Sequence, residues 1–287
     1  MIRYVRTLDA AGVTDSALRR GYRKAAFSLL RSDPQHHLAI RLLIPARLQP
    51  HLVAAYWFAA AADGVADDGP ASGRLDRFDA WTRTTGPQGT GNRPGTPLSA
   101  FWHTVEAIGL PRRRIQALLD GLRTDAAAGA RVLDEDGLQQ YVDRVSLPYL
   151  MLLVGVHPEC QGSEASRLFR PLALACQRID FLADLAQDLR AERPRLAHEP
   201  AARAAHRTRA RADLQTAGDV LSDTPEELLP MMRAFLRLHE LRLDTIDRCD
   251  PELEHRSVRT PLLPAFRILA VAAGEAAGKA AQEAVRD

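Results

Sequence analysis

The chain of 287 residues has few lysines and few aromatic residues. Lys24 and Lys279 are the only lysines, so arginine supplies the remaining positive charge, and the net charge is only +2. A composition rich in arginine and alanine is typical of a high-GC coding bias and is therefore weak evidence for nucleic-acid binding. Nucleic-acid binding also needs a segregated basic face with stacking aromatics, and Phe, Trp and Tyr make up only 6% of the chain. We expect no nucleic-acid partner.

Cysteines and long apolar runs are also scarce. Cys160, Cys176 and Cys249 are odd in number and widely spaced, which excludes both a disulfide framework and a CxxC metal site and favours a reducing cytoplasm. The most apolar stretches, 52–62 and 147–156, fall short of the roughly 18 residues that span a bilayer. The first ten residues lack the continuous apolar core of a signal peptide. We expect a cytoplasmic protein with no integral membrane segment.

Helical patterns dominate what is present, because apolar residues recur at three- and four-residue spacing while alternating Val/Ile/Thr runs are almost absent. The fold class predicted is all-α, with one domain over residues 1–287. The helices expected are 15–31, 35–43, 47–66, 71–82, 98–108, 111–128, 134–156, 164–190, 199–221, 224–247 and 258–284. Three of them, 47–66, 134–156 and 164–190, are apolar on more than one face and should be central. The segment 84–97 is the one clear loop.

Two of these apolar helices carry aspartates at four-residue spacing. The first aspartate motif is Asp63 and Asp67, and the second is Asp180, Asp184 and Asp188. Four residues advance a helix by about 6 Å and return to nearly the same face, so the carboxylates within each motif are neighbours and repel one another. Such repulsion is tolerable on a wet surface, but on an apolar helix it calls for a compensating cation.

Magnesium is the cation that these residues favour. It prefers hard oxygen ligands, keeps several waters, and is usually shared between a few carboxylates and substrate phosphate oxygens. A single acidic pair is usually a solvated helix face, but two such motifs on separate apolar helices favour a shared site. The sequence therefore predicts that magnesium binds a diphosphate. The predicted magnesium ligands are Asp63, Asp67, Asp180, Asp184 and Asp188.

The order of these motifs resembles the squalene/phytoene synthase family of all-α isoprenoid synthases over nearly the whole chain. The matching features are a Phe-containing helix at Phe27, a Leu-Pro segment at Leu43 to Pro45, the pattern Tyr56-x-Phe58 leading to Asp63 and Asp67, Gly121 to Asp125, Tyr141 with Val145, and Gln177 followed by Asp184 and Asp188. Asp180 stands where the family has asparagine, and an aspartate there is still a competent magnesium ligand.

The resemblance implies a bundle of about ten helices around a central cavity that holds an isoprenyl diphosphate. Asp63, Asp67, Asp180 and Asp184 would be the catalytic residues, and Asp188 a further metal ligand. The residues expected to bind substrate are Arg47, Tyr56, Phe58, Tyr141, Arg144, Tyr149, Gln177 and Arg193. Arg178 is a further candidate for diphosphate contact, because the arginine fork matches phosphate oxygens; of these arginines, Arg144 is preferred.

The chain also departs from the family pattern. Ala60 stands where head-to-head synthases usually have an arginine, and Gly64 replaces the usual second aspartate. After Val145 the family carries small residues, whereas this chain has Leu147 and Tyr149, which should fill volume that a second prenyl chain would occupy. These changes resemble a branch of the family that prenylates aromatic compounds such as carbazoles.

Three functions follow from these observations. The main expectation is a magnesium-dependent prenyltransferase that ionises an allylic diphosphate, with dimethylallyl diphosphate as the expected donor, and alkylates a small aromatic acceptor in natural-product biosynthesis. The alternative is a head-to-head synthase that condenses two prenyl diphosphates, of the squalene or phytoene type. A non-catalytic helical scaffold is the third, and the retained aspartates argue against it.

Overall fold

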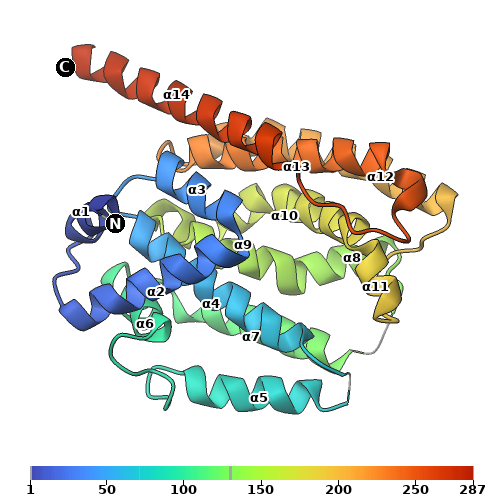
Figure 1. Cartoon of the computed structure of the whole chain (residues 1–287), viewed down its shortest axis with the longest axis horizontal. Coiled ribbons are helices and arrows are strands. Elements are labelled where there is room, and N and C mark those ends of the chain that lie inside the picture. The colour runs from blue at the N-terminus through green and yellow to red at the C-terminus, as the bar shows by residue number, and fades with distance from the viewer. Residues whose placement is uncertain (1, 71, 129–130, 287) are drawn as a thin grey trace. The chain divides into compact units, whose positions relative to one another are not determined.

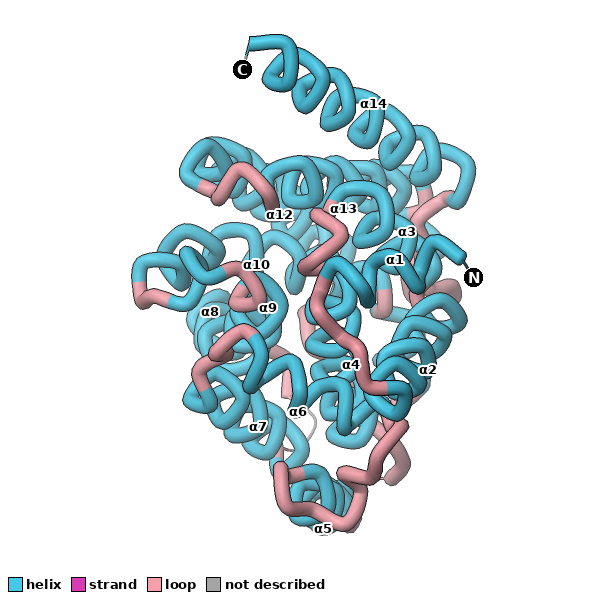
Figure 2. Tube along the Cα trace, turned by 90° about the vertical axis from the view of Figure 1, so that its left-hand side faces the viewer, coloured by secondary structure: helices cyan, strands magenta, loops and turns pink. Residues whose placement is uncertain are grey.

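The computed structural model describes residues 2–70, 72–128 and 131–286. These residues form helices, turns and loops, and no strand occurs among them, which confirms the all-α class (Figures 1 and 2). The chain separates into two compact units. Unit 1 is drawn from residues 1–128 and 148–165, and unit 2 from residues 129–147 and 166–287. The single domain expected from the sequence stays a prediction.

Unit 1 is organised around one apolar helix, α4. Its helices are α1 (Ile2–Ala10), α2 (Ser16–Ser32), α3 (Pro34–Leu43), α4 (Gln49–Asp67), α5 (Arg74–Thr85), α6 (Pro97–Ala107), α7 (Arg112–Ala127), nearly all of α9 (Leu147–Val154), and the 3-10 turn η2 (Pro158–Gln161). Helix α4 packs against α2, α3, α5, α6 and α7. Because α4 is surrounded, most of its apolar residues are buried, on more than one face, as the sequence predicted.

Local capping and one close approach fix the helices around α4. The side chains of Asp15, Asp33 and Thr96 each accept a hydrogen bond from a backbone N–H in the first turn of α2, α3 and α6, respectively. Gly21 lets α2 approach α6 closely, since a Cβ at this position would lie 2.4 Å from the carbonyl oxygen of Thr96.

Unit 2 contains the remaining helices. They are α8 (Glu135–Tyr141), the π-helical segment η1 (Val142–Ser146), α10 (Glu164–Ala183), α11 (Leu185–Arg190), α12 (Pro200–Val220), η3 (Leu221–Asp223), α13 (Leu229–Arg248), η4 (Asp250–Glu252) and α14 (Leu262–Arg286). Helix α13 packs against both α12 and α14, and Figure 1 shows the three helices beside one another.

Two of the expected helices are interrupted, and one helix was missed. The stretch 134–156 contains the π-helical segment η1, in which the N–H of Leu147 donates to the carbonyl of Val142. Pro148 has no N–H to continue the regular pattern, so the widened turn lies directly before it. The stretch 164–190 breaks at Asp184, between α10 and α11. Helix α1 was not expected from the sequence.

The structure also bears on membrane insertion and on cysteine pairing. None of the helices in the described part of the chain is both long enough and apolar enough to cross a bilayer. Cys160, Cys176 and Cys249 all lie within the described residues and are free thiols, as their spacing predicted.

Candidate functional site

The first aspartate motif lies in the last turns of α4, in unit 1. Asp63 is half-buried and Asp67, the last residue of the helix, is exposed. The backbone carbonyls at a helix C-terminus carry partial negative charge, and the last turn of α4 contains no basic residue. Asp68 adds a third carboxylate as the C-cap residue. This end of α4 therefore concentrates negative charge on a helix that is otherwise apolar, which is a setting for a divalent cation.

A polar and aromatic cluster lies two turns before the first motif. The Tyr56 hydroxyl donates to Asp33 Oδ2 at 2.7 Å, and the Nδ1 of His36 lies 2.5 Å from the same oxygen. Burial opposes the charge on Asp33, but the ion pair with His36 and the hydrogen bonds from His36 and Tyr56 outweigh it and hold the pKa of Asp33 far below its ordinary value. The Tyr149 ring meets the Tyr56 ring edge-on, with centroids 6.2 Å apart.

The structure thus places two of the predicted substrate residues, Tyr56 and Tyr149, together in unit 1. Asp33 and His36 were not predicted from the sequence, where the one local signal is an aspartate before Pro34, typical of a helix N-cap. Phe58 is different, because its ring is buried and stacks on Phe101 with centroids 3.9 Å apart. Phe58 is a core residue of unit 1.

Arg47 lies in the exposed turn between α3 and α4. It follows Pro45, whose carbonyl accepts the N–H groups of Leu48 and Gln49 and so closes the turn that starts α4. The arginine is therefore held on a defined turn near the N-terminus of α4, whereas Asp63 and Asp67 are at the C-terminus of the same helix.

The second aspartate motif spans the break between α10 and α11, in unit 2. The N–H of Val258 donates to the carbonyl of Ala183 at 2.8 Å, while the N–H of Gln187 turns to the carbonyl of Asp184, also at 2.8 Å. The α-helical bond that would join Gln187 to Ala183 is thereby replaced. Helical contact resumes as the N–H of Asp188 donates to the carbonyl of Asp184 at 3.0 Å. The motif keeps its four-residue spacing across this single interruption.

Arg242, on α13, reaches across to this motif. Its Nη1 donates to Asp180 Oδ1, and its Nη2 lies 3.7 Å from Asp184 Oδ1. Burial raises the pKa of Asp184 and the neighbouring Asp180 raises it further, whereas the positive charges of Arg242 and Arg259 act in the opposite direction. Sequence reasoning missed Arg242, because in an arginine-rich chain nothing local marks one arginine as the partner of a distant carboxylate.

Three further predicted residues surround the second motif within unit 2. The hydroxyl of Ser146 donates to Gln177 Oε1 at 2.7 Å, which ties η1 to α10. The ring of Tyr141 packs against that of Phe181 with centroids 5.2 Å apart, and the guanidinium of Arg195 lies over the Tyr141 ring, 5.5 Å from its centroid. The backbone N–H of Arg193 donates to the carbonyl of Asp188 at 2.8 Å.

Arg178, a candidate for diphosphate contact in the sequence, forms ion pairs inside unit 2 instead. Its side chain is 1% exposed, and it is paired with Glu135 at 2.6 Å and with Asp213 at 2.8 Å. The hydrogen bond from Arg178 holds the pKa of Glu135 below its ordinary value. The expectation of diphosphate contact was wrong, because the guanidinium is committed to carboxylates on α8 and α12. Arg144, the preferred arginine, is exposed on η1 and donates to the carbonyl of Gln140.

The residues of each motif fit magnesium that is bound partly by carboxylates and partly by substrate phosphate oxygens. Within the described ranges, no three Asp, Glu, His or Cys side chains converge closely enough to enclose a metal ion by themselves. Magnesium seldom occupies an all-protein cage and usually takes one or two carboxylates, with waters and phosphate oxygens completing its shell. The side chains of Asp180 and Asp184, which are 40% and 47% exposed, present their oxygens to incoming ligands in this way.

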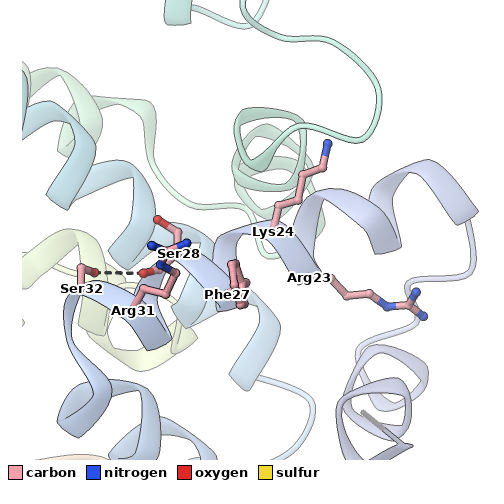
Figure 3. A pocket seen from close by; sticks show the side chains of 6 residues that line it. All are labelled: Arg23, Lys24, Phe27, Ser28, Arg31 and Ser32. Atoms are coloured by element: carbon pink, nitrogen blue, oxygen red, sulfur yellow. Dashed lines mark hydrogen bonds between the residues drawn. The ribbon is translucent and has the colours of Figure 1, made fainter.

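A separate hollow lies on the surface of α2, in unit 1 (Figure 3). It measures about 660 Å³ and is lined by side chains of this one helix: Arg23, Lys24, Phe27, Ser28, Arg31 and Ser32. The Phe27 side chain is 59% exposed, and Arg31 lies over its ring at 5.7 Å. The hollow includes none of the residues predicted to bind metal or substrate, so it is not part of the candidate site.

Curated relatives match part of the chain. It is 32% identical over 151 residues to the bifunctional protein CrtB/UppS of Streptomyces coelicolor and 29% identical over 155 residues to presqualene diphosphate synthase of Rhodopseudomonas palustris. These alignments cover 52% and 53% of this chain. The chain spans only 27% of the first relative's length and 54% of the second's.

Solved structures share the fold over more of the chain. Squalene synthase HpnC from Alicyclobacillus acidocaldarius superimposes with a TM-score of 0.65 at 21% identity, covering 84% of this chain and 98% of that one. A dehydrosqualene synthase gives 0.74 at 14% identity, with 90% and 97% covered, and YisP from Bacillus subtilis gives 0.62 at 16%, with 88% and 96% covered. At these identities the likeness shows the fold alone.

The family model described as squalene/phytoene synthase matches residues 29–204. This match includes the whole of both aspartate motifs and more than half of the chain. It agrees with the order of motifs along the sequence and with the all-helical fold. The chain belongs to the squalene/phytoene synthase family.

Proposed function

We propose that this protein joins two prenyl diphosphates head to head. The observation that carries the proposal is the family match over residues 29–204, which contains both aspartate motifs without interruption. The similarity to presqualene diphosphate synthase supports the same reaction class. The expectation of an aromatic acceptor, which the sequence favoured, is less well supported, since one curated relative is named presqualene diphosphate synthase and none of the relatives and structures described above is named for an aromatic acceptor.

In this proposal each aspartate motif would hold magnesium that binds diphosphate oxygens. Asp63 and Asp67 would be the ligands in unit 1, and Asp180, Asp184 and Asp188 would be the ligands in unit 2. Bound magnesium supplies Lewis-acid stabilisation to the departing diphosphate. The donor C1–O bond breaks, diphosphate leaves with the bonding electrons, and the allylic cation is attacked by a double bond of the second prenyl diphosphate, which then loses a proton.

The remaining predicted residues are proposed to bind the substrate and to shield the allylic cation from water. Tyr56, Tyr141 and Tyr149 present aromatic rings, whose faces stabilise positive charge and whose bulk excludes water. Arg47, Arg144 and Arg193 are the arginines proposed to contact diphosphate oxygens. Gln177 is held by Ser146 and orients the face of α10 that carries Asp180 and Asp184.

The proposal is tested by incubating the purified protein and magnesium with farnesyl or geranylgeranyl diphosphate alone. We expect release of inorganic pyrophosphate together with a product that contains two prenyl chains, detected by mass spectrometry. A product that contains a single prenyl chain, such as the prenyl alcohol, would contradict head-to-head coupling. Asp184→Asn serves as the control that should abolish both signals.

A second candidate keeps the donor half of this reaction and changes the acceptor. Ala60 and Gly64 remove two charges that head-to-head synthases usually have. These features favour a planar acceptor in place of the second prenyl chain. Dimethylallyl diphosphate with carbazole as the acceptor tests it, and a prenylated carbazole formed in the absence of any coupled prenyl product would replace the first proposal with the second.

A further inference from the structure

Arg242 bridges two of the carboxylates that are proposed to bind magnesium. It donates to Asp180 from Nη1, and its Nη2 lies 3.7 Å from Asp184. The side chain is 21% exposed, so its guanidinium is more buried than either carboxylate. Arg242 comes from α13, whereas both aspartates come from the helix that breaks at Asp184. The contact is therefore made by tertiary packing within unit 2.

Arg242 is the positive partner of two neighbouring carboxylates. Asp180 and Asp184 lie four residues apart, and the positive charge of Arg242 acts on Asp184 against the effect of burial. Half-buried neighbouring carboxylates are unfavourable without a cation, because burial penalises the charged form and like charges repel. One guanidinium between two carboxylates offsets part of these penalties, so the second aspartate motif holds one positive charge before any metal arrives.

The contact of Arg242 with Asp180 and Asp184 affects how the second motif can bind metal. A divalent cation bound by Asp180 and Asp184 would lie close to the guanidinium of Arg242, because the guanidinium contacts Oδ1 of Asp180 and lies 3.7 Å from Oδ1 of Asp184. Positive charges at such short range repel each other, so metal binding favours withdrawal of the guanidinium. An arginine that withdraws from a partly buried pair needs a new anionic partner, and a diphosphate supplies one whose oxygens fit the guanidinium fork.

We propose that Arg242 is a diphosphate-binding residue that couples metal binding to substrate binding: it occupies the second aspartate motif in the free protein and transfers to the diphosphate when metal takes the carboxylates. This inference deepens the proposed function and rests on its metal-dependent first half. It requires that metal and diphosphate each strengthen the binding of the other.

The test compares Arg242→Gln with the wild-type full chain in two binding experiments. In the first, Mn²⁺ alone is titrated and free Mn²⁺ is followed by electron paramagnetic resonance. Removing the competing cation should tighten Mn²⁺ binding by roughly 5-fold or more, which is the scale of an ordinary coupling between sites. In the second, inorganic pyrophosphate is titrated by calorimetry at saturating magnesium, and its binding should weaken by a similar factor.

Three variants serve as controls. Arg237→Gln removes an arginine of the same helix that pairs with Glu275 at 3.6 Å, and it should change neither binding constant. Asp184→Asn in the Arg242→Gln background should remove the gain in Mn²⁺ affinity. Arg242→Lys keeps the charge without the fork, so its Mn²⁺ affinity should stay near the wild-type value while pyrophosphate binding weakens; this variant carries the test if the glutamine variant does not fold.

The two changes in opposite directions distinguish this role from a structural one. Unchanged or weaker Mn²⁺ binding in Arg242→Gln, with an unchanged melting temperature, overturns the inference, and so does a wild-type chain that binds no Mn²⁺ at Asp184. Neither titration requires a coupled product. Absence of head-to-head product with both binding changes intact would therefore overturn only the proposed function.

Discussion

The N–H of Val258 donates to the carbonyl of Ala183, and the helix that carries the second aspartate motif breaks at the next residue, Asp184. The bond ties the segment before α14 to the end of α10. Arg259 follows Val258 directly, and its positive charge reaches Asp184. The break therefore brings the C-terminal part of the chain to the carboxylate on which the proposed chemistry depends.

The two aspartate motifs should be needed for turnover and not for folding. We expect Asp63→Asn and Asp184→Asn each to lower kcat/KM by at least about 100-fold, because each removes a ligand whose metal supplies several kcal/mol of stabilisation to the leaving group. Steady-state assays with prenyl diphosphate give the rates, and thermal melts give the folding control. Full activity in both variants would be incompatible with a magnesium mechanism.

The hydrogen bond between Tyr56 and Asp33 should stabilise unit 1. Tyr56→Phe deletes only the hydroxyl that donates at 2.7 Å to a carboxylate, and we expect a loss of about 1–2 kcal/mol in the free energy of unfolding. The same substitution in an Asp33→Asn background should cost less, because the charged acceptor is gone. Equal losses in the two backgrounds, measured by urea denaturation, would show that the hydroxyl and the carboxylate are not coupled.

Arg178 should be a structural residue of unit 2. Arg178→Met leaves the carboxylates of Glu135 and Asp213 without their shared cation, and we expect a loss of about 3 kcal/mol in stability. The matched control is Arg144→Met, which changes an exposed arginine and should cost less than about 0.5 kcal/mol. A stable Arg178→Met protein with weakened pyrophosphate binding would instead restore the role in diphosphate contact.

His51 should make the protein sensitive to acid. Its Nδ1 lies 3.3 Å from the Tyr22 hydroxyl and 3.1 Å from Thr104 Oγ1, and burial, with a smaller contribution from the charge of His103, lowers its pKa from 6.5 to about 4. Because the unfolded chain binds the proton more readily, the stability present above pH 6.5 is lost as the pH falls through 4.

The expected loss from His51 is about 3 kcal/mol over this interval. Thermal melts between pH 7.5 and pH 4 measure it. His51→Gln should flatten the dependence of the melting temperature on pH in that range, while other groups continue to titrate. An identical pH dependence in the variant and the wild-type chain would mean that His51 does not carry this effect.

The features that could be predicted from the sequence are those that depend only on short segments of the chain. Helix α4 and both aspartate motifs could be recognised because their apolar pattern and four-residue spacing are properties of short segments. The break at Asp184 could not be predicted, since the donor to Ala183 is Val258, far along the chain. The role of Arg242 and the burial of Arg178 were missed for the same reason: the carboxylate that an arginine meets is decided by tertiary packing.

The departures from the family pattern are real changes in residue size and charge. The prediction of an aromatic acceptor placed too much weight on them. Leu147 and Tyr149 are larger than the usual residues, yet Tyr149 packs edge-on against Tyr56, so its bulk is directed at a neighbouring ring of unit 1. A larger side chain does not necessarily reduce the volume of a substrate cavity, because the side chain can pack against its own neighbours instead.

The most direct test of the proposed magnesium mechanism is the position of metal in crystals grown with Mn²⁺ and a farnesyl thiodiphosphate that resists ionisation. The proposed magnesium mechanism predicts anomalous scattering peaks at Asp63 or Asp67 and at Asp180, Asp184 or Asp188, with diphosphate oxygens completing each coordination shell. A bound diphosphate whose oxygens contact neither aspartate motif, or metal peaks found elsewhere, would contradict it.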